Sequence, residues 1–196
     1  MLDRSKVWTG SINERALDPQ PPGTVGLYDT TLRDGEQTIG VVLTPDEKLE
    51  IARALDAAGV DRIEAGFPRV SDDDFRAVEM IAAAGLRAEV WGFSRAVPAD
   101  VEALVELGVP ASVIESPISD AKLQALGVTH EKMLERIRSA VSFATAAGIK
   151  VAFFGVDSSR AELDFYRRAY ETAVEAGAQE VVVVDTIGVA TPEAAA

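Results

Sequence analysis

The chain has 196 residues, of which 47% are hydrophobic and 26% are charged, a balance typical of a globular domain rather than a disordered segment. Its formal net charge of −13 argues against a nucleic-acid partner, which requires a basic surface. It has no cysteine, which excludes disulfides, thiolate metal sites and a cysteine nucleophile and fits a cytoplasmic location.

Residues 1–24 are predicted to be an N-terminal leader. The stretch is polar and ends in several prolines and a glycine, so it lacks the apolar centre of a signal peptide. No later run approaches the roughly 20 apolar residues of a membrane span, so we expect no membrane partner. The folded domain is therefore expected to occupy residues 25–196.

One pattern recurs along this domain: a helical segment ends at a glycine and a short apolar run follows. A glycine just past a helix takes the left-handed conformation that closes it, and near-continuous apolar runs are typical of parallel strands. The glycines are Gly59, Gly85, Gly108, Gly148 and Gly177, and the expected strands are 25–28, 60–65, 86–91, 111–115, 149–154 and 180–184. Six strands alternating with five helices predict a parallel barrel or a doubly wound sheet.

Capping residues mark the expected helix starts. Thr44-Pro45-Asp46-Glu47 combines a cap, a proline at the first helical position and an acidic first turn. Thr191-Pro192-Glu193 is typical of the start of a sixth helix, and the sequence stops three residues later. Because eight strands close such a barrel, we expect an α/β (β/α)8 TIM barrel truncated before strand seven, or a fragment of a longer parent.

The end of the first strand carries the densest group of reactive side chains. In a parallel barrel the carboxyl ends of the strands share one rim, where side chains converge on a ligand. Asp34 could hold a hard divalent cation, and Arg33 could stabilise negative charge that develops on an oxygen. Taken alone, this pair is more commonly an ion pair at a turn.

Residues 29–37, DTTLRDGEQ, resemble the signature of the DRE-TIM metallolyases. These include isopropylmalate, homocitrate and citramalate synthases, with hydroxymethylglutaryl-CoA lyase as a cousin, and the match is nearly letter for letter with the synthase branch. The resemblance implies that Arg33 activates a carbonyl, that Asp34 binds the metal and that Gln37 contacts substrate.

Three further strand ends are similar to motifs of this family. The stretch IEAGFP resembles its second-strand motif, FSRA its third-strand motif and DTIGVATP its sixth-strand motif. The resemblance implies substrate-binding roles for Glu64, Arg95 and Thr186, the last two toward a 2-oxo acid. Since loops are polar in any protein, each position alone is weak evidence.

The sequence also departs from the family pattern. Val156 stands where many synthases have a catalytic glutamate, which leaves the general base unassigned and makes a helix cap one interpretation of Asp157. The family's paired metal-binding histidines lie one strand beyond the last residue, and residues 116–120 lack the histidine that often follows the fourth strand. His130, the only histidine, is interpreted as a surface or capping residue.

For a complete barrel, the resemblance implies a Claisen-type condensation of acetyl-CoA, or another acyl-CoA, with a 2-oxo acid in amino-acid biosynthesis. It also implies a divalent metal (Mg, Mn or Zn) and a homo-oligomer, namely a dimer. We expect the chain alone, with one metal ligand, to be inactive. Two alternatives stay open: a metal-dependent carbon–carbon lyase or aldolase on the same barrel, and a non-catalytic remnant that acts as an interaction surface.

Overall fold

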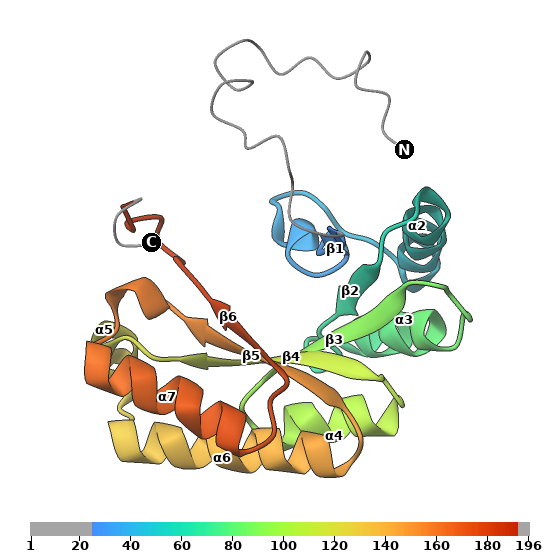
Figure 1. Ribbon diagram of the computed structural model, residues 1–196. Helices are drawn as coiled ribbons and strands as arrows, with labels where there is room; N and C mark the ends of the chain where they lie inside the picture. Colours follow the sequence, from blue (N-terminus) through green and yellow to red (C-terminus); the bar gives the residue numbers. More distant parts are fainter. Residues whose placement is uncertain (1–24, 192–196) are drawn as a thin grey trace.

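The computed structural model describes residues 25–191. They form one curved sheet of six parallel strands in the order β1-β2-β3-β4-β5-β6, with helices packed along its outer face (Figure 1). The strands are β1 (Tyr28–Asp29), β2 (Arg62–Gly66), β3 (Glu89–Arg95), β4 (Ala111–Pro117), β5 (Lys150–Val156) and β6 (Glu180–Val183). The helices are α2 (Pro45–Ala58), α3 (Asp72–Ala82), α4 (Pro98–Glu106), α5 (Asp120–Leu126), α6 (His130–Ala146) and α7 (Leu163–Glu175), with 3-10 turns η2 (Gly35–Gln37) and η3 (Ser158–Arg160).

The sequential strand order decides between the two predicted architectures. A doubly wound sheet reverses its strand order at a switch point, whereas here each strand pairs with the next one along the chain. The prediction of a truncated TIM barrel is confirmed, and the described residues form an open half-barrel. The leader, residues 1–24, and most of the predicted sixth helix start lie outside the described residues.

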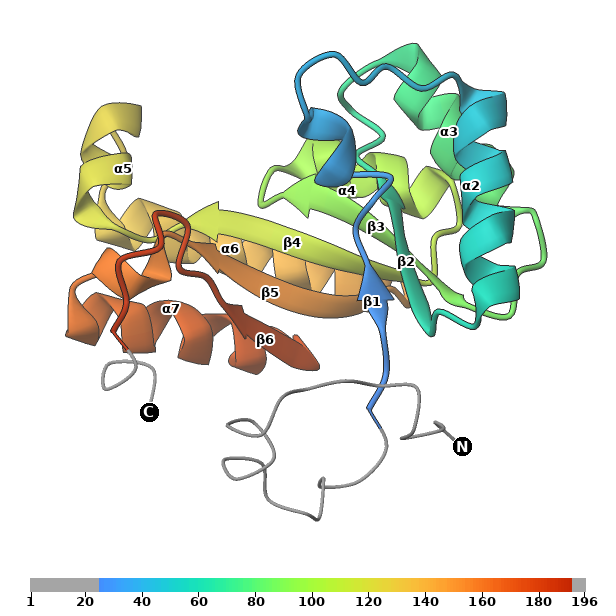
Figure 2. The same cartoon turned by 90° about the horizontal axis from the view of Figure 1, so that it is seen from above.

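The number of helices was predicted one too low. Helix α5 stands apart from the helix layer at the carboxyl end of β4 (Figure 2). Its start is capped by the Ser119 hydroxyl, which accepts from the backbone N–H of Lys122, and it ends at Gly127 with a φ of 63°. Both signals are present in the sequence, but seven residues are fewer than a helix normally needs to show an apolar period.

The expected helix boundaries are otherwise confirmed. Thr44 and Glu47 form a complete capping box, and all five predicted helix-ending glycines have positive φ. The expected strand 86–91 is displaced, however, because β3 begins only at Glu89. The backbone N–H groups of Arg87 and Ala88 both donate to the carboxylate of Asp56, at 2.8 Å, instead of joining the ladder.

The larger core lies between the sheet and its helices. It includes Leu104 of α4, which is fully buried against β3. At the contact the strand carries Gly92, where a Cβ would lie only 2.3 Å from the Leu104 side chain. The missing side chain thus sets how closely α4 approaches the sheet. No helix within residues 25–191 is long and apolar enough to cross a bilayer.

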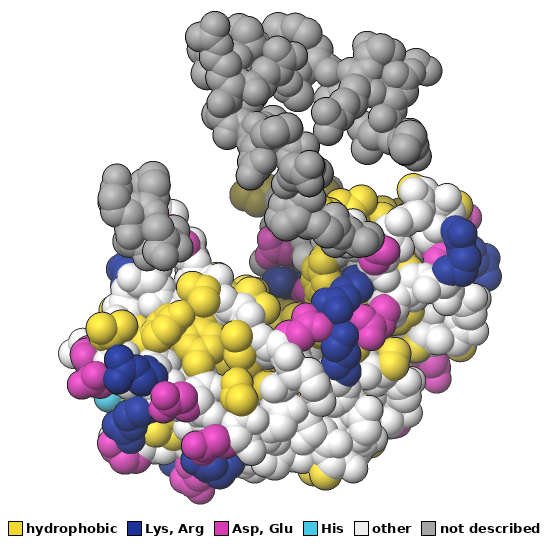
Figure 3. Space-filling model, viewed as in Figure 1, with side chains coloured by type: hydrophobic (Ala, Val, Ile, Leu, Met, Phe, Trp, Pro, Cys, Tyr) yellow, Lys and Arg dark blue, Asp and Glu magenta, His cyan; other side chains and the backbone are white. Residues whose placement is uncertain are grey.

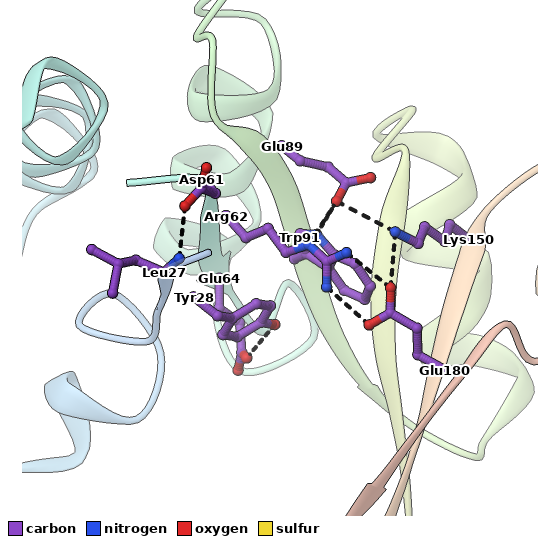
Figure 4. Close-up of polar contacts among 9 residues, drawn as sticks. All are labelled: Leu27, Tyr28, Asp61, Arg62, Glu64, Glu89, Trp91, Lys150 and Glu180. Atoms are coloured by element: carbon purple, nitrogen blue, oxygen red, sulfur yellow. Dashed lines mark hydrogen bonds and ion pairs between the residues drawn. The ribbon is translucent and has the colours of Figure 1, made fainter. Parts of the chain in front are cut away.

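A group of ion pairs lies on the inner face of the half-barrel, where strands β2, β3, β5 and β6 start. We call it the charged floor, and it consists of Arg62, Glu89, Lys150 and Glu180 (Figure 4). Arg62 on β2 donates two hydrogen bonds of 2.9 Å to Glu180 on β6, and Lys150 lies 2.9 Å from the same carboxylate. Since β2 and β6 are not neighbours in the sheet, the floor fixes the curvature across the interior.

Aromatic side chains lie above the charged floor. Trp91 is fully buried. The charged groups of Arg62 and Lys150 lie over its ring, 4.9 and 5.1 Å from the ring centre. Phe93 follows on the same strand and meets Phe67 and Phe154 edge-on. This apolar layer separates the charged floor from the rim, where the strands end in polar residues.

Candidate functional site

A tight turn after β1 brings Arg33 over the inner face. The backbone N–H groups of Arg33, Asp34 and Gly35 all donate to the carbonyl oxygen of Thr30, at 2.9 to 3.1 Å. Leu32 is fully buried, which anchors the turn, and the Arg33 side chain is only 13% exposed. A charged side chain this buried requires partners, and its immediate surroundings supply them.

The partners of Arg33 lie on three sides. Its Nε donates to the Glu64 carboxylate on β2, its Nη1 lies 3.1 Å from Asp34, and its guanidinium stacks over Phe93 at 4.1 Å from the ring centre. The structure thus brings together the predicted residues Arg33, Asp34 and Glu64. Their position is fixed by an ion pair, a turn and an aromatic ring.

Glu64 has a second partner, Tyr28, which was not predicted as a site residue. The Tyr28 hydroxyl donates to Glu64 Oε2 at 2.6 Å (Figure 4), so both carboxylate oxygens are used inside the protein. Burial and the neighbouring Glu64 charge raise the pKa of Tyr28 well above its ordinary value, and the phenol stays protonated as a donor. Tyr28 was predicted only as a strand residue, and its partner lies 36 residues away in the chain.

Asp34 is the exposed member of the group. Its side chain is 63% exposed, and its contact with Arg33 leaves most of the carboxylate facing solvent. Within residues 25–191 no three histidine, aspartate or glutamate side chains lie close enough together to hold a metal ion. Asp34 is chemically suited to a hard divalent cation, but the described residues do not by themselves make a complete metal site.

Gln37 lies beside the turn on a small open hollow of about 210 Å³. The hollow is lined by Leu32, Arg33, Glu36, Gln37, Phe67, Val70 and Asp74. Its acidic wall is held by the buried Lys48, which lies 2.5 Å from Glu36 and 2.6 Å from Asp74. Arg33 and Gln37, which was predicted to contact substrate, therefore line the same hollow.

Arg95 and Thr186 are placed at the rim but are engaged elsewhere. Arg95 donates to the buried Asp100 at the start of α4, at 2.7 and 3.1 Å, and lies against Phe67. The Thr186 hydroxyl accepts from the backbone N–H of Asp157 at 2.8 Å, which ties the ends of β5 and β6 together. Among the described residues, no hydrogen bond or ion pair joins either side chain to Arg33 or Glu64.

Asp157 was interpreted as a helix cap, and this is correct for its position but not for its side chain. It precedes η3 with a φ of 62°, yet its side chain makes no capping hydrogen bond. The buried carboxylate instead binds Arg160, at 2.5 and 2.8 Å, and the Ser119 hydroxyl at 2.5 Å. Arg160 first, and then Ser119, lower the pKa of Asp157, which fixes it as a structural anion.

His130 matches its interpretation as a residue at a helix start. It is the first residue of α6, its Nε2 lies 2.7 Å from Asp120, and its ring stacks on Phe165 with 3.9 Å between ring centres. These contacts join α5, α6 and α7 on the outer side of the sheet. Nothing in them relates His130 to the rim.

A second hollow, of about 330 Å³, lies at the carboxyl ends of β4 and β5. It is lined by Glu115, Pro117, Lys122, Ala125, Leu126 and Val156. Neither a role for Glu115 nor the helix α5, which forms one wall, was predicted from the sequence. Alternation along β4 could have indicated Glu115, because it continues the inward-facing positions of Ala111 and Val113.

Comparison with known proteins gives three findings. The family model described as HMGL-like matches residues 24–196. In Methanopyrus kandleri, Homocitrate synthase AksA is 43% identical over 93% of this chain and 46% of that protein, and a protein named Probable 2-isopropylmalate synthase is 45% identical over 87% of this chain and 34% of that protein. The chain thus spans less than half the length of these relatives. The crystal structure of HMG-CoA lyase from Bacillus subtilis, 18% identical, superposes with a TM-score of 0.75 over 88% of this chain and 61% of that chain, which shows a shared fold.

Proposed function

Because the chain belongs to the HMGL-like family, we propose that the full-length protein is an enzyme that condenses an acyl-CoA with a 2-oxo acid. The names of its relatives, homocitrate synthase and 2-isopropylmalate synthase, support this reaction class. The observation that carries the proposal is the fixed position of Arg33 at the rim, between Glu64, Asp34 and Phe93. An arginine held this way can donate to an oxygen without first being ordered.

Arg33 would act on the keto oxygen of the 2-oxo acid. Its contacts with Glu64 and Asp34 use Nε and Nη1, which leaves Nη2 to donate to substrate. When a carbanion attacks the keto carbon, the oxygen gains negative charge, and the guanidinium stabilises it in the transition state more than in the ground state. Glu64 and Tyr28 keep the guanidinium aimed during this change.

The remaining predicted residues would hold the 2-oxo acid. Asp34 would supply one ligand to a divalent cation, which when bound would supply Lewis-acid polarisation of the keto group. Gln37 would contact substrate in the hollow that it shares with Arg33. Arg95 and Thr186 would bind the acid's carboxylate, for which Arg95 retains Nη1 beyond its bonds to Asp100.

Release of CoA thiol tests the proposal. The full-length protein, supplied with acetyl-CoA and Mg²⁺, Mn²⁺ or Zn²⁺, is assayed against a panel of 2-oxo acids with a thiol reagent. We expect release with at least one acid and a loss of at least about 100-fold in the Arg33→Ala variant. Arg53→Ala, on the exposed face of α2, is the matched control.

Each alternative predicts a different result in this assay. Normal turnover in Arg33→Ala would refute the role of Arg33. No thiol release with any acid would refute the condensation. Cleavage of a hydroxyacyl-CoA would then identify a lyase, and complete inactivity with intact fold would identify a non-catalytic barrel.

A further inference from the structure

Glu115 is a carboxylate of the inner face that the proposed function does not use. It is the fifth residue of β4 and follows Ala111 and Val113 on the inward side of the strand. Its partners in the parallel ladder are Arg95 on β3 and Phe154 on β5. The side chain therefore lies at the level where the aromatic layer ends and the rim begins.

The surroundings of Glu115 are those of a reactive group rather than of a structural anion. It lines the second hollow, and among residues 25–191 no hydrogen bond or ion pair engages its carboxylate. Asp157 provides the contrast, since two hydrogen bonds from Arg160 and one from Ser119 occupy it. Glu115 is thus half-buried and free to accept a proton.

The charges that face Glu115 come from four elements. Arg33 in the turn after β1, Arg95 on β3 and Lys122 on α5 favour its anion, whereas Asp100 on α4 opposes it. Burial outweighs these charges and raises the pKa of Glu115 above the ordinary value of a glutamate. Such a carboxylate is a stronger base than an exposed one, and the three cations favour its anion.

The register of the sheet places Glu115 beside the end of β5. Val156 of β5 pairs with Pro117, two residues after Glu115. Glu115 and Val156 line the same hollow. A carboxylate on β4 therefore lies next to the space at the carboxyl ends of both strands.

We infer that Glu115 is the general base of the condensation and that the second hollow receives the acyl end of the acyl-CoA. The inference rests on the proposed function. Glu115 takes a proton from the carbon next to the thioester carbonyl, and the C–H electron pair forms the enolate. The enolate carbon bonds to the keto carbon, whose oxygen becomes an alkoxide beside Arg33 and receives the proton back from Glu115. Water then cleaves the thioester and releases the thiol.

Proton exchange isolates the step assigned to Glu115. Acetyl-CoA is incubated in D₂O with the full-length protein and a non-reacting analogue of the accepted 2-oxo acid, and deuterium in the methyl group is measured. Glu115→Gln should lower both this exchange and thiol release by about 100-fold or more, whereas Glu115→Asp should retain part of both. The KM for the 2-oxo acid should change little. Glu106→Gln, at the exposed end of α4, is the matched control.

The pH profile gives an independent readout. Because the active form of Glu115 is the anion, kcat/KM should fall as pH drops through its pKa. Lys122→Met removes a cation that lowers this pKa, so it should move the acid limb of the profile to higher pH. A structural role for Glu115 would lower thermal stability in Glu115→Gln and leave the Lys122→Met profile unshifted.

The outcomes separate this inference from the proposed function. A wild-type protein that releases no thiol with any acid would defeat both. An active wild-type protein with normal exchange in Glu115→Gln would overturn the role of Glu115 alone. Loss of exchange in Glu115→Gln, with partial activity in Glu115→Asp and a shifted profile in Lys122→Met, supports it.

Discussion

At the scale of single residues, the geometry of Arg33 matters more than its charge. Its guanidinium meets Glu64 at one edge, Asp34 at another and Phe93 with its face. Only a planar group with several fixed donors can make these contacts together, and a lysine ammonium cannot. The site therefore depends on an arginine that is held in one orientation.

We predict that Arg33→Lys in the full-length protein lowers kcat by about 100-fold or more although the positive charge is kept. Arg33→Lys should lower the free energy of unfolding much less than Arg33→Ala, which removes the charge. Steady-state kinetics and thermal denaturation check this, with Arg53→Lys as the matched control. A lysine variant of near-normal kcat would show that charge alone is sufficient.

Glu64 should contribute more to stability than its second partner, Tyr28. Glu64→Gln leaves the largely buried Arg33 without its nearest counter-charge and should cost about 3 kcal/mol of unfolding free energy. Tyr28→Phe removes one hydrogen bond and should cost about 1 kcal/mol. Urea-induced unfolding of both variants measures the difference, and the reverse order would contradict the assignment of Glu64 as the counter-ion of Arg33.

At the scale of elements, close packing decides where the helices lie on the sheet. We predict that Gly92→Ala destabilises the protein by roughly 1–3 kcal/mol, because the new methyl group would force Leu104 and α4 outward. The control is Gly35→Ala, where the nearest atom would be 3.7 Å from the added Cβ. Urea-induced unfolding measures both. Equal effects would show that α4 can shift without cost.

Helix features that depend on residues close together in the sequence were predicted well. The capping box at Thr44 and the helix-ending glycines involve residues within one turn, so the sequence displays them. The short α5 carries the same local signals at Ser119 and Gly127, but it is too brief for a periodic pattern. Strand ends were less accurate, since Asp56, 31 residues earlier in the chain, delays the start of β3.

The partners of the rim side chains could not be predicted in the same way. The motifs predicted that Arg33, Asp34, Glu64, Arg95 and Thr186 share one rim, and the structure joins only the first three by direct contacts. The contacts of Tyr28 with Glu64 and of Thr186 with the backbone of Asp157 join segments about 30 residues apart. They depend on strand register, which a single sequence does not specify at this precision.

At the scale of the whole molecule, the charged floor links strands that do not pair. Arg62 first, and burial and Lys150 to smaller extents, set the pKa of Glu180, and the net effect lowers it. A lowered pKa means that the folded state favours the anion. Its contribution to stability is therefore present above the ordinary glutamate pKa of about 4.3 and is lost as pH falls through the lower folded-state value.

We predict that Glu180→Gln destabilises the protein by about 1 kcal/mol at pH 7, a modest cost because the side chains are about one-third exposed and screened by solvent. The difference between variant and wild type should shrink as pH falls below about 4. Urea-induced unfolding at both pH values tests this. A difference that does not depend on pH would show that the floor acts through packing and not through charge.

The open edge of the half-barrel predicts association of the chain of residues 1–196. In the part that the structure describes, β6 pairs only with β5, and its Val181 and Val183 are 48% and 62% exposed within a hydrophobic area visible over β6 in Figure 3. Unpaired strands of this kind associate edge to edge unless a charge opposes it. Sedimentation velocity should show concentration-dependent association, and Val183→Lys should reduce it. Val174→Lys, at a 56% exposed position on α7, should not. Equal association in both variants would place the contact elsewhere.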